Sequence, residues 1–221
     1  MSASVRPDTD CPSILIANTV LLGCETRHGR VSADDDFEND SERDMGLKYD
    51  HLDEITRGYM LEEIESDSAG GQMYFSPRLH EAGCESWPDL LRDAARTGSD
   101  DSLAEAIRFN DCLQTHLPRA KPKGGFTMAA VPVNAPETLA EGEFNRFYLR
   151  GLCRRAISDG IPCLIAYRAK AVENARSASE ALIGKQFDPA KVLDDLRTSQ
   201  GVDTALGLPP GPNSGMCLRL P

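Results

Sequence analysis

The sequence has few aromatic residues, no long apolar run and no paired-cysteine motif. Only 6% of its 221 residues are aromatic, and no apolar stretch approaches the roughly 18 residues that a membrane-spanning helix needs. Its seven cysteines are widely spaced and include no CxxC pair, which argues against a disulfide framework and against a zinc module. We therefore expect free thiols in a reducing compartment.

The common motifs of nucleotide-binding and metal-dependent enzymes are also missing. The sequence contains no GxGxxG, no GxxxxGK[ST] and no HExxH. Its four histidines, at positions 28, 51, 80 and 116, stand apart from one another. His80 and Cys84 would share one face of a helix, but two ligands do not make a zinc site. We expect no catalytic residue, no cofactor and no bound metal ion.

Charge is abundant but unevenly distributed. Residues 1–118 carry 10 Lys and Arg against 25 Asp and Glu, whereas residues 119–221 carry 14 against 10. The net charge of −11 argues against duplex binding by the whole chain. The asymmetry suggests two modules with different surroundings.

Composition predicts an accessory N-terminal extension followed by two modules. Residues 33–44 hold seven acids and one Arg, a pattern typical of a poorly ordered linker. We predict an extension over 1–48, a helical module over 49–118 and an α+β module over 119–221. The basic run 119–125 is the predicted hinge between the modules.

A second interpretation of the N-terminus is a lipoprotein signal, because Leu21-Leu22-Gly23-Cys24 resembles a lipobox. The preceding segment carries Asp8 and Asp10 beside Arg6, whereas an export signal begins with net positive charge. We therefore favour a short strand or a poorly ordered extension over export, and expect a cytoplasmic or virion-associated protein.

Apolar periodicity predicts an α+β fold, mainly helical in the first half, with a small sheet packed against helices in the second. The helix over 136–159 is the strongest, with a capping-box pattern at Thr138–Glu141 and a stop at Asp159-Gly160. The other predicted helices are 52–69, 86–98, 99–118 and 188–196, and the predicted strands are 72–75, 126–133, 161–167 and 216–220.

Three arginines at four-residue spacing are the main candidate binding residues. Arg146, Arg150 and Arg154 fall on one face of the predicted helix. Such a row can bind phosphates or an acidic partner through charge-assisted hydrogen bonds. The alternatives are a solvated outer face and pairing with the acidic first half of the same chain.

The C-terminal turn is a second candidate. Asn213 and Ser214 lie in the run PPGPNSG, a rigid turn that serves either as a recognition element or as the closure of an edge strand. The paired acids at 62–63, 100–101 and 194–195 are interpreted as solvated surface, since adjacent helical residues point about 100° apart.

Several segments resemble an uncharacterised family found in tailed-phage and prophage genomes. They cover about residues 50–221 and are LDEITRGYMLEEI with FSPRL (52–79), ETLAEGEFNRFYLRGLCRRAI (137–157), YRAKAVEN, LIGK and PPGPNSG. The closing region is also similar, more loosely, to MuF-type minor head proteins. Those end in His-Pro-x-Cys-Arg-Cys, of which only Cys217 and Arg219 fall in place here. The resemblance implies a phage context and no catalytic residue.

We therefore predict a non-enzymatic, phage-derived structural or assembly protein that binds other protein subunits, including copies of itself. An alternative is a cytoplasmic phosphate-directed enzyme, such as a metal-dependent nuclease, that uses the arginine row with acids such as Asp100 and Asp101. A third is an accessory protein that binds nucleic acid through the same arginines.

Overall fold

The computed structural model describes residues 46–122, 124–172, 175–199 and 215–221. They belong to one compact unit, Ser41–Pro221, with the predicted α+β fold. The helices are α1 (Glu54–Gly70), α2 (Glu81–Thr97), α3 (Asp100–Phe109), α4 (Ala135–Ser158), α5 (Ser177–Glu180) and α6 (Pro189–Thr198). The strands are β1 (His116–Ala120), β2 (Phe126–Ala130), β3 (Leu164–Arg168), β4 (Gln186–Phe187) and β5 (Met216–Arg219).

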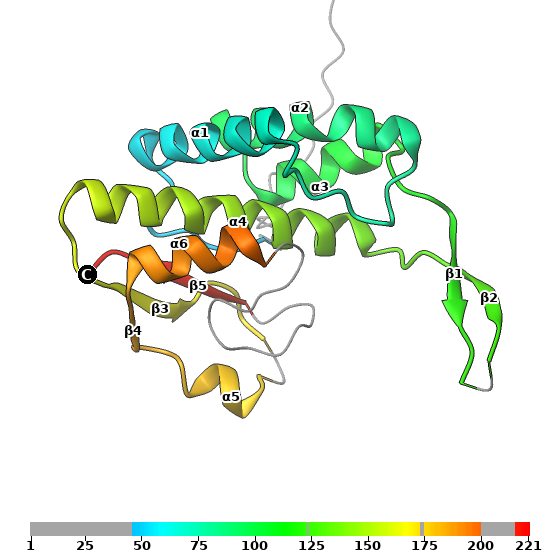
Figure 1. Ribbon diagram of the computed structural model, residues 1–221. Helices are drawn as coiled ribbons and strands as arrows, with labels where there is room; N and C mark the ends of the chain where they lie inside the picture. Colours follow the sequence, from blue (N-terminus) through cyan, green and yellow to red (C-terminus); the bar gives the residue numbers. More distant parts are fainter. Residues whose placement is uncertain (1–45, 123, 173–174, 200–214) are drawn as a thin grey trace, which may run out of the picture. The chain divides into compact units, whose positions relative to one another are not determined.

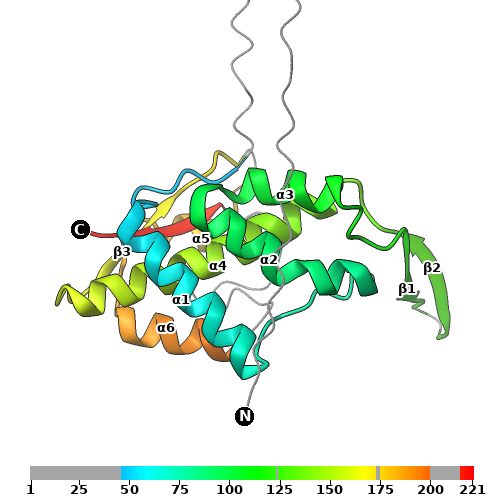
Figure 2. The same cartoon turned by 90° about the horizontal axis from the view of Figure 1, so that it is seen from above.

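Helix α4 is the centre of this unit. Helices α1, α2 and α3 lie over one side of it, and α6 and β5 pack on the other (Figures 1 and 2). The aromatic side chains of Phe144, Phe147 and Tyr148 are all within 1% of complete burial. A helix covered on several sides needs apolar residues around most of its circumference, and α4 has them.

The ends of α4 follow local signals only in part. Pro136 lies in the first turn, where its missing N–H costs nothing, and Gly160 follows the helix with φ +68°. The predicted capping box is wrong. Asn134 is the N-cap residue, and Thr138 lies inside the helix, where its hydroxyl donates to the Asn134 carbonyl at 2.9 Å.

Helices α1 and α4 approach each other closely at Gly151. A Cβ atom there would lie 2.9 Å from the Thr56 carbonyl oxygen and 2.8 Å from Cγ of Met60. Glycine therefore permits the backbone contact that brings the polar faces of the two helices together.

The three-stranded sheet has the order β4-β3-β5 and is antiparallel throughout. Ile165 of β3 pairs with Arg219 of β5 and with Gln186 of β4. The Lys48 N–H donates to the Ala169 carbonyl at 2.9 Å, which ties the start of the described chain to the end of β3. The predicted strands at 161–167 and 216–220 are confirmed within a few residues.

Three predictions in the first half need correction. Helix α2 begins at Glu81 rather than near residue 86, because the His80 side chain caps it, and Pro88 lies inside the helix. Residues 72–75 form no strand. Helix α3 ends at Phe109, and the chain then turns into β1.

The predicted hinge at 119–125 is the end of β1 and the loop of the β1–β2 hairpin, apart from Lys123, which is outside the described residues. Helices on both sides of it, α1 and α4, pack against each other. The predicted N-terminal strand, lipobox and acidic linker lie outside the described residues. None of the helices in the described ranges has the length and apolar character required to cross a membrane.

Candidate functional site

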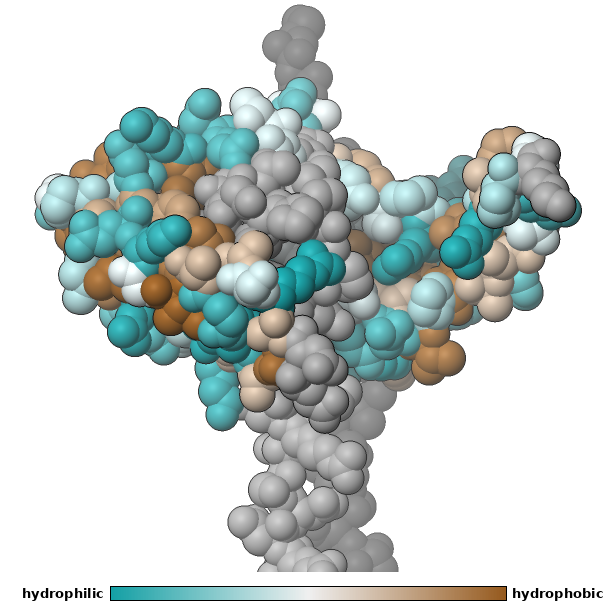
Figure 3. Space-filling model, turned by 90° about the horizontal axis from the view of Figure 1, so that it is seen from below, coloured by the Kyte–Doolittle hydropathy of each residue, from teal (hydrophilic) through white to brown (hydrophobic). Residues whose placement is uncertain are grey.

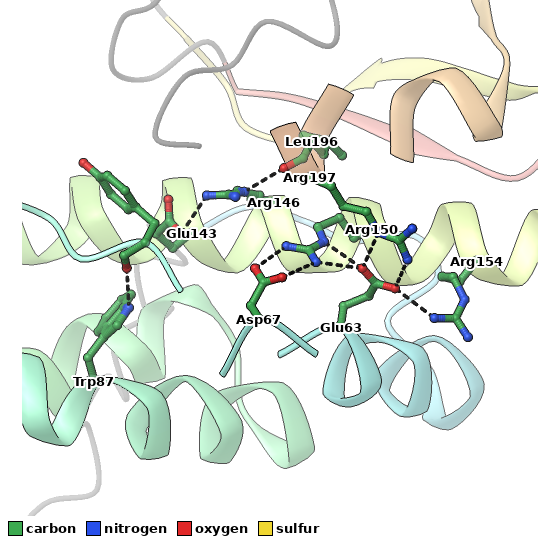
Figure 4. A network of polar contacts seen from close by, with 10 residues as sticks. Glu63, Asp67, Trp87, Glu143, Arg146, Arg150, Arg154, Leu196 and Arg197 are labelled. Atoms are coloured by element: carbon green, nitrogen blue, oxygen red, sulfur yellow. Dashed lines mark hydrogen bonds and ion pairs between the residues drawn. The ribbon is translucent and has the colours of Figure 1, made fainter. Parts of the chain in front are cut away.

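Two arginines of the α4 row, Arg150 and Arg154, face acids of α1 (Figure 4). Arg150 donates through Nε to Glu63 at 2.9 Å, and through both terminal nitrogens to Asp67 at 2.6 and 2.8 Å. Arg150 is 1% exposed, and Glu63 is fully buried. A two-pronged contact of this kind matches the planar guanidinium to the carboxylate.

Glu63 is shared among three arginines. Arg154 lies 2.8 Å and Arg197 of α6 2.5 Å from its Oε1 atom, beside the contact with Arg150. Burial alone raises the pKa of Glu63, but hydrogen bonds from Arg197, Arg154 and Arg150 outweigh it and lower the pKa to about 2. Glu63 therefore joins α1, α4 and α6 as an anion at neutral pH.

Arg146 forms a second buried ion pair, with Glu143, in which fewer of its guanidinium nitrogens have hydrogen-bond partners. Its Nε donates to the Leu196 carbonyl at 3.2 Å, and its Nη1 lies 3.4 Å from Glu143. Within the described residues its Nη2 has no hydrogen-bond partner. Burial raises the pKa of Glu143 to about 7 despite the attraction of Arg146.

The partner-binding prediction for the arginine row must be revised. Arg146 and Arg150 are buried, so they offer little surface to a separate molecule. Arg154 is one-third exposed, and its guanidinium already contacts Glu62 and Glu63. Asn213 and Ser214 lie outside the described residues.

The sequence did contain a signal for this intramolecular pairing. Glu63 and Asp67 are four residues apart, and so are Arg150 and Arg154; two helices with this spacing can align acid against base. The interpretation of the 62–63 acid pair as solvated surface is wrong for Glu63, which is buried.

Asp100 and Asp101, the acids of the alternative enzymatic hypothesis, begin α3. Asp100 accepts the Leu47 N–H at 2.9 Å, and Asp101 accepts the Gly46 N–H at 3.1 Å. Burial, and then the charge of Asp101, raise the pKa of Asp100 to about 6. Both side chains hold the segment that leads into α1.

The histidine and cysteine residues of the described chain do not form a ligand cluster. His80 accepts the Gly83 N–H through Nδ1 at 3.0 Å, and its Nε2 contacts the Asp111 carbonyl. His80 is thus used as a helix cap. Across the described residues there is no group of three or more His, Cys, Asp or Glu side chains placed to hold a metal ion.

The β1–β2 hairpin, residues 116–130, presents exposed apolar side chains; we call it the arm. It stands clear of the helices (Figures 1 and 3). Its register pairs Phe126 with Ala120 and Met128 with Pro118. Directly paired residues share one face of a hairpin, and residues alternate between faces.

One face of the arm is almost entirely apolar. Its members are Pro118, Ala120, Phe126, Met128 and Ala130, together with His116. All six are exposed, with Phe126 at 72% and Met128 at 62%. Large apolar side chains presented together on a monomer surface mark an interaction site.

Comparison with protein-family models, with curated protein sequences and with solved structures gives no match to this chain.

Proposed function

We propose that this protein is a non-enzymatic, phage-derived structural or assembly protein that binds other protein subunits of a particle. The observation that carries the proposal is the arm, which presents an apolar face to solvent away from the helical core. Protein interfaces use aromatic and Met side chains in their centres. The phage context is proposed from the sequence resemblance alone.

The helical core provides a rigid base for such an arm. Glu63 joins arginines of α4 and α6 to α1, so these charged groups stabilise the fold. We therefore propose that the arm, and not the arginine row, binds the partner subunit.

The test is quantitative mass spectrometry on density-gradient fractions of a culture that produces the chain, with negative-stain images of the same fractions. We expect the chain to sediment with particles at stoichiometric abundance. A variant with Phe126→Ser and Met128→Ser should leave the particle fractions. Wild-type chain found only in the soluble fraction would overturn the proposal, and nuclease and phosphatase assays would then follow.

A further inference from the structure

The pairing of the arm determines which backbone groups point to its two outer edges. The Lys121 N–H donates to the Gly125 carbonyl, and the Val131 N–H donates to the Thr115 carbonyl, both at 2.9 Å. Bonded and unbonded positions alternate along an antiparallel pair, so in this register the odd-numbered residues bond across the arm. The even-numbered residues therefore direct their N–H and C=O groups outward.

The outer edge of β1 is protected against further pairing. Its outward positions are His116, Pro118 and Ala120. Pro118, at the centre of the strand, has no N–H to donate, and proline on an edge strand is one of the features that prevent another strand from adding to a sheet. The exposed charge of Arg119 beside it acts in the same direction.

The outer edge of β2 carries neither proline nor charge. Its outward positions are Phe126, Met128 and Ala130, and each of them has both an N–H and a C=O. Among the residues that the structure describes, none forms a hydrogen bond with these outward groups. The sequence from Gly124 to Pro136 contains no charged residue, and β2 lies on the side of the arm away from the helices (Figures 1 and 2).

An uncovered strand edge is complementary to another extended strand, and β2 is complementary to itself. In an antiparallel pair of two copies centred on Met128, that residue faces Met128 of the second copy, and Phe126 faces Ala130. Every outward N–H and C=O of these three residues then has a partner. A centre shifted by one residue leaves Phe126 or Ala130 without a partner in the other strand.

Charge favours the same arrangement. Residues 112–136 contain three basic residues and no acid, whereas residues 46–111, which form the helices before the arm, contain 6 basic and 15 acidic residues. Antiparallel pairing turns the tip of each arm toward the body of the other copy, so the basic tip approaches acidic helices. The two β1 strands lie outermost, which separates the two Arg119 residues by three strand spacings, roughly 14 Å, more than the Debye length at physiological salt.

Pairing would also complete a sheet. A two-stranded hairpin is marginally stable in water, and three or more strands with an apolar face are needed for independent stability. Two arms joined through β2 form four strands whose apolar faces lie on the same side, because directly opposed residues share a face. The enlarged apolar face stays accessible to other subunits.

We infer that β2 pairs antiparallel with β2 of a second copy of this chain, around a twofold axis at Met128. The inference rests on the proposed function for a protein partner and adds that one partner is this chain itself. The edge of the arm binds the second copy, and the apolar face binds the other subunits of the particle.

The first experiment measures the self-association constant of the full chain by sedimentation velocity and light scattering. We expect a dimer in equilibrium with monomer. Ala130→Pro removes an outward N–H of β2 and keeps the bonds inside the arm, so it should weaken dimerisation at least ~10-fold. Ala120→Pro is the matched control, because it makes the same change on the outer edge of β1, and it should leave dimerisation unchanged. Urea unfolding checks that both variants are folded.

A cysteine cross-link tests the register. Opposed Cα atoms of a bonded antiparallel pair are about 5.5 Å apart, which is within reach of a disulfide. Met128→Cys should therefore give a covalent dimer under mild oxidation, at least ~10-fold more than the wild-type chain with its native cysteines. Thr127→Cys is the control. This position is exposed on the same strand but faces Ala129 of the second copy, so the variant should stay at the wild-type level.

A chain that stays monomeric at about 0.1 mM, or a dimer that Ala130→Pro does not weaken, would overturn the inference. Equal weakening by both proline variants, or equal cross-linking of both cysteine variants, would also overturn it, because neither outcome selects the β2 edge. Particle association by a monomeric chain would refute the second copy and leave the proposed function standing. Dimerisation through β2 without particle association would do the reverse.

Discussion

At the scale of single residues, Arg150 and Glu63 are charges removed from water. Such groups are costly to bury, and their mutual attraction offsets the cost only when hydrogen bonding is nearly complete. Arg150 meets this condition through three hydrogen bonds to Glu63 and Asp67. The ion pair specifies how α1 and α4 align. Its net contribution to the free energy of unfolding is small, whereas removal of one partner alone is costly because it leaves a buried charge unpaired.

Arg150→Ala should therefore destabilise the fold by about 3–5 kcal/mol, because it leaves Asp67 buried without its cation and removes one of the three arginines that Glu63 binds. Arg119→Ala on the arm is the control and should change the free energy of unfolding by no more than about 0.5 kcal/mol. Urea denaturation of both variants measures the difference.

A loss below about 1 kcal/mol at Arg150 would contradict the buried pairing. A further variant that combines Arg150→Met with Asp67→Asn should recover part of the lost stability. It removes both charges of the pair together, while Glu63 keeps Arg154 and Arg197.

Glu143 gives a prediction about pH. Its carboxyl ionises near 4.5 when unperturbed and near 7 in the fold, where Arg146, Arg150 and Asp67 are the charges that act on it. Between these two pH values the carboxyl of Glu143 is protonated in the folded state and ionised in the unfolded state. The stabilisation from this protonation is therefore complete below about pH 4.5 and is lost as the pH rises through 7.

Glu143→Gln should abolish this pH-dependent contribution to the free energy of unfolding, because the glutamine side chain does not ionise. Relative to the variant, the wild-type free energy of unfolding should fall by an amount on the order of 3 kcal/mol between pH 4.5 and 8. Chemical denaturation across this range measures it, with the exposed Glu85→Gln as the control. A difference that does not change with pH would show that Glu143 ionises normally.

At the scale of elements, the α1–α4 contact depends on a missing side chain. Gly151 lies where a Cβ would be 2.9 Å from the Thr56 carbonyl and 3.0 Å from the Met60 nitrogen. These are backbone atoms, so relief requires the helices to move apart. Such a movement would also stretch the hydrogen bonds of Arg150.

Gly151→Ala should consequently destabilise the fold by about 1–3 kcal/mol. Gly142 is a matched control on the same helix, because a Cβ there meets nothing within 4 Å. Gly142→Ala should stabilise the fold by about 0.5–1 kcal/mol through helix propensity alone. Equal effects of the two substitutions in thermal unfolding would contradict the close approach.

The elements that were predicted well have strong local signals. Asp188 caps α6 and Pro189 begins it, as the sequence indicated. The errors have tertiary causes. Leu79 forms a bridge with Leu113, and the His80 N–H donates to the Cys112 carbonyl at 3.1 Å, so contacts across some 30 residues set the start of α2. Pro88, which we expected near a helix start, is tolerated inside it.

At the scale of the whole molecule, the core of the described chain runs from Leu47 to Leu218. It joins helices from both predicted modules, and Leu47 and Lys48 are held by Asp100 and by Ala169. This part of the chain contains a sizeable apolar core of its own.

Deletion of residues 1–45 should therefore leave a protein that unfolds cooperatively. Circular dichroism during urea titration, with light scattering to check the mass, tests this expectation. Loss of the unfolding transition would show that the N-terminal segment contributes to the fold. Deletion of residues 112–221, which removes α4 and the sheet, is the control and should abolish the transition.

Local sequence by itself determined the α+β class, the extent of α4 and the positions of α6 and β5, because caps, prolines and apolar periodicity act within a few residues. Helical spacing also placed Arg146, Arg150 and Arg154 on one face. Only the tertiary structure decided that this face turns inward. The acids that pair with Arg150 lie 87 and 83 residues away in the sequence, and periodicity states which residues share a face but leaves open what covers it.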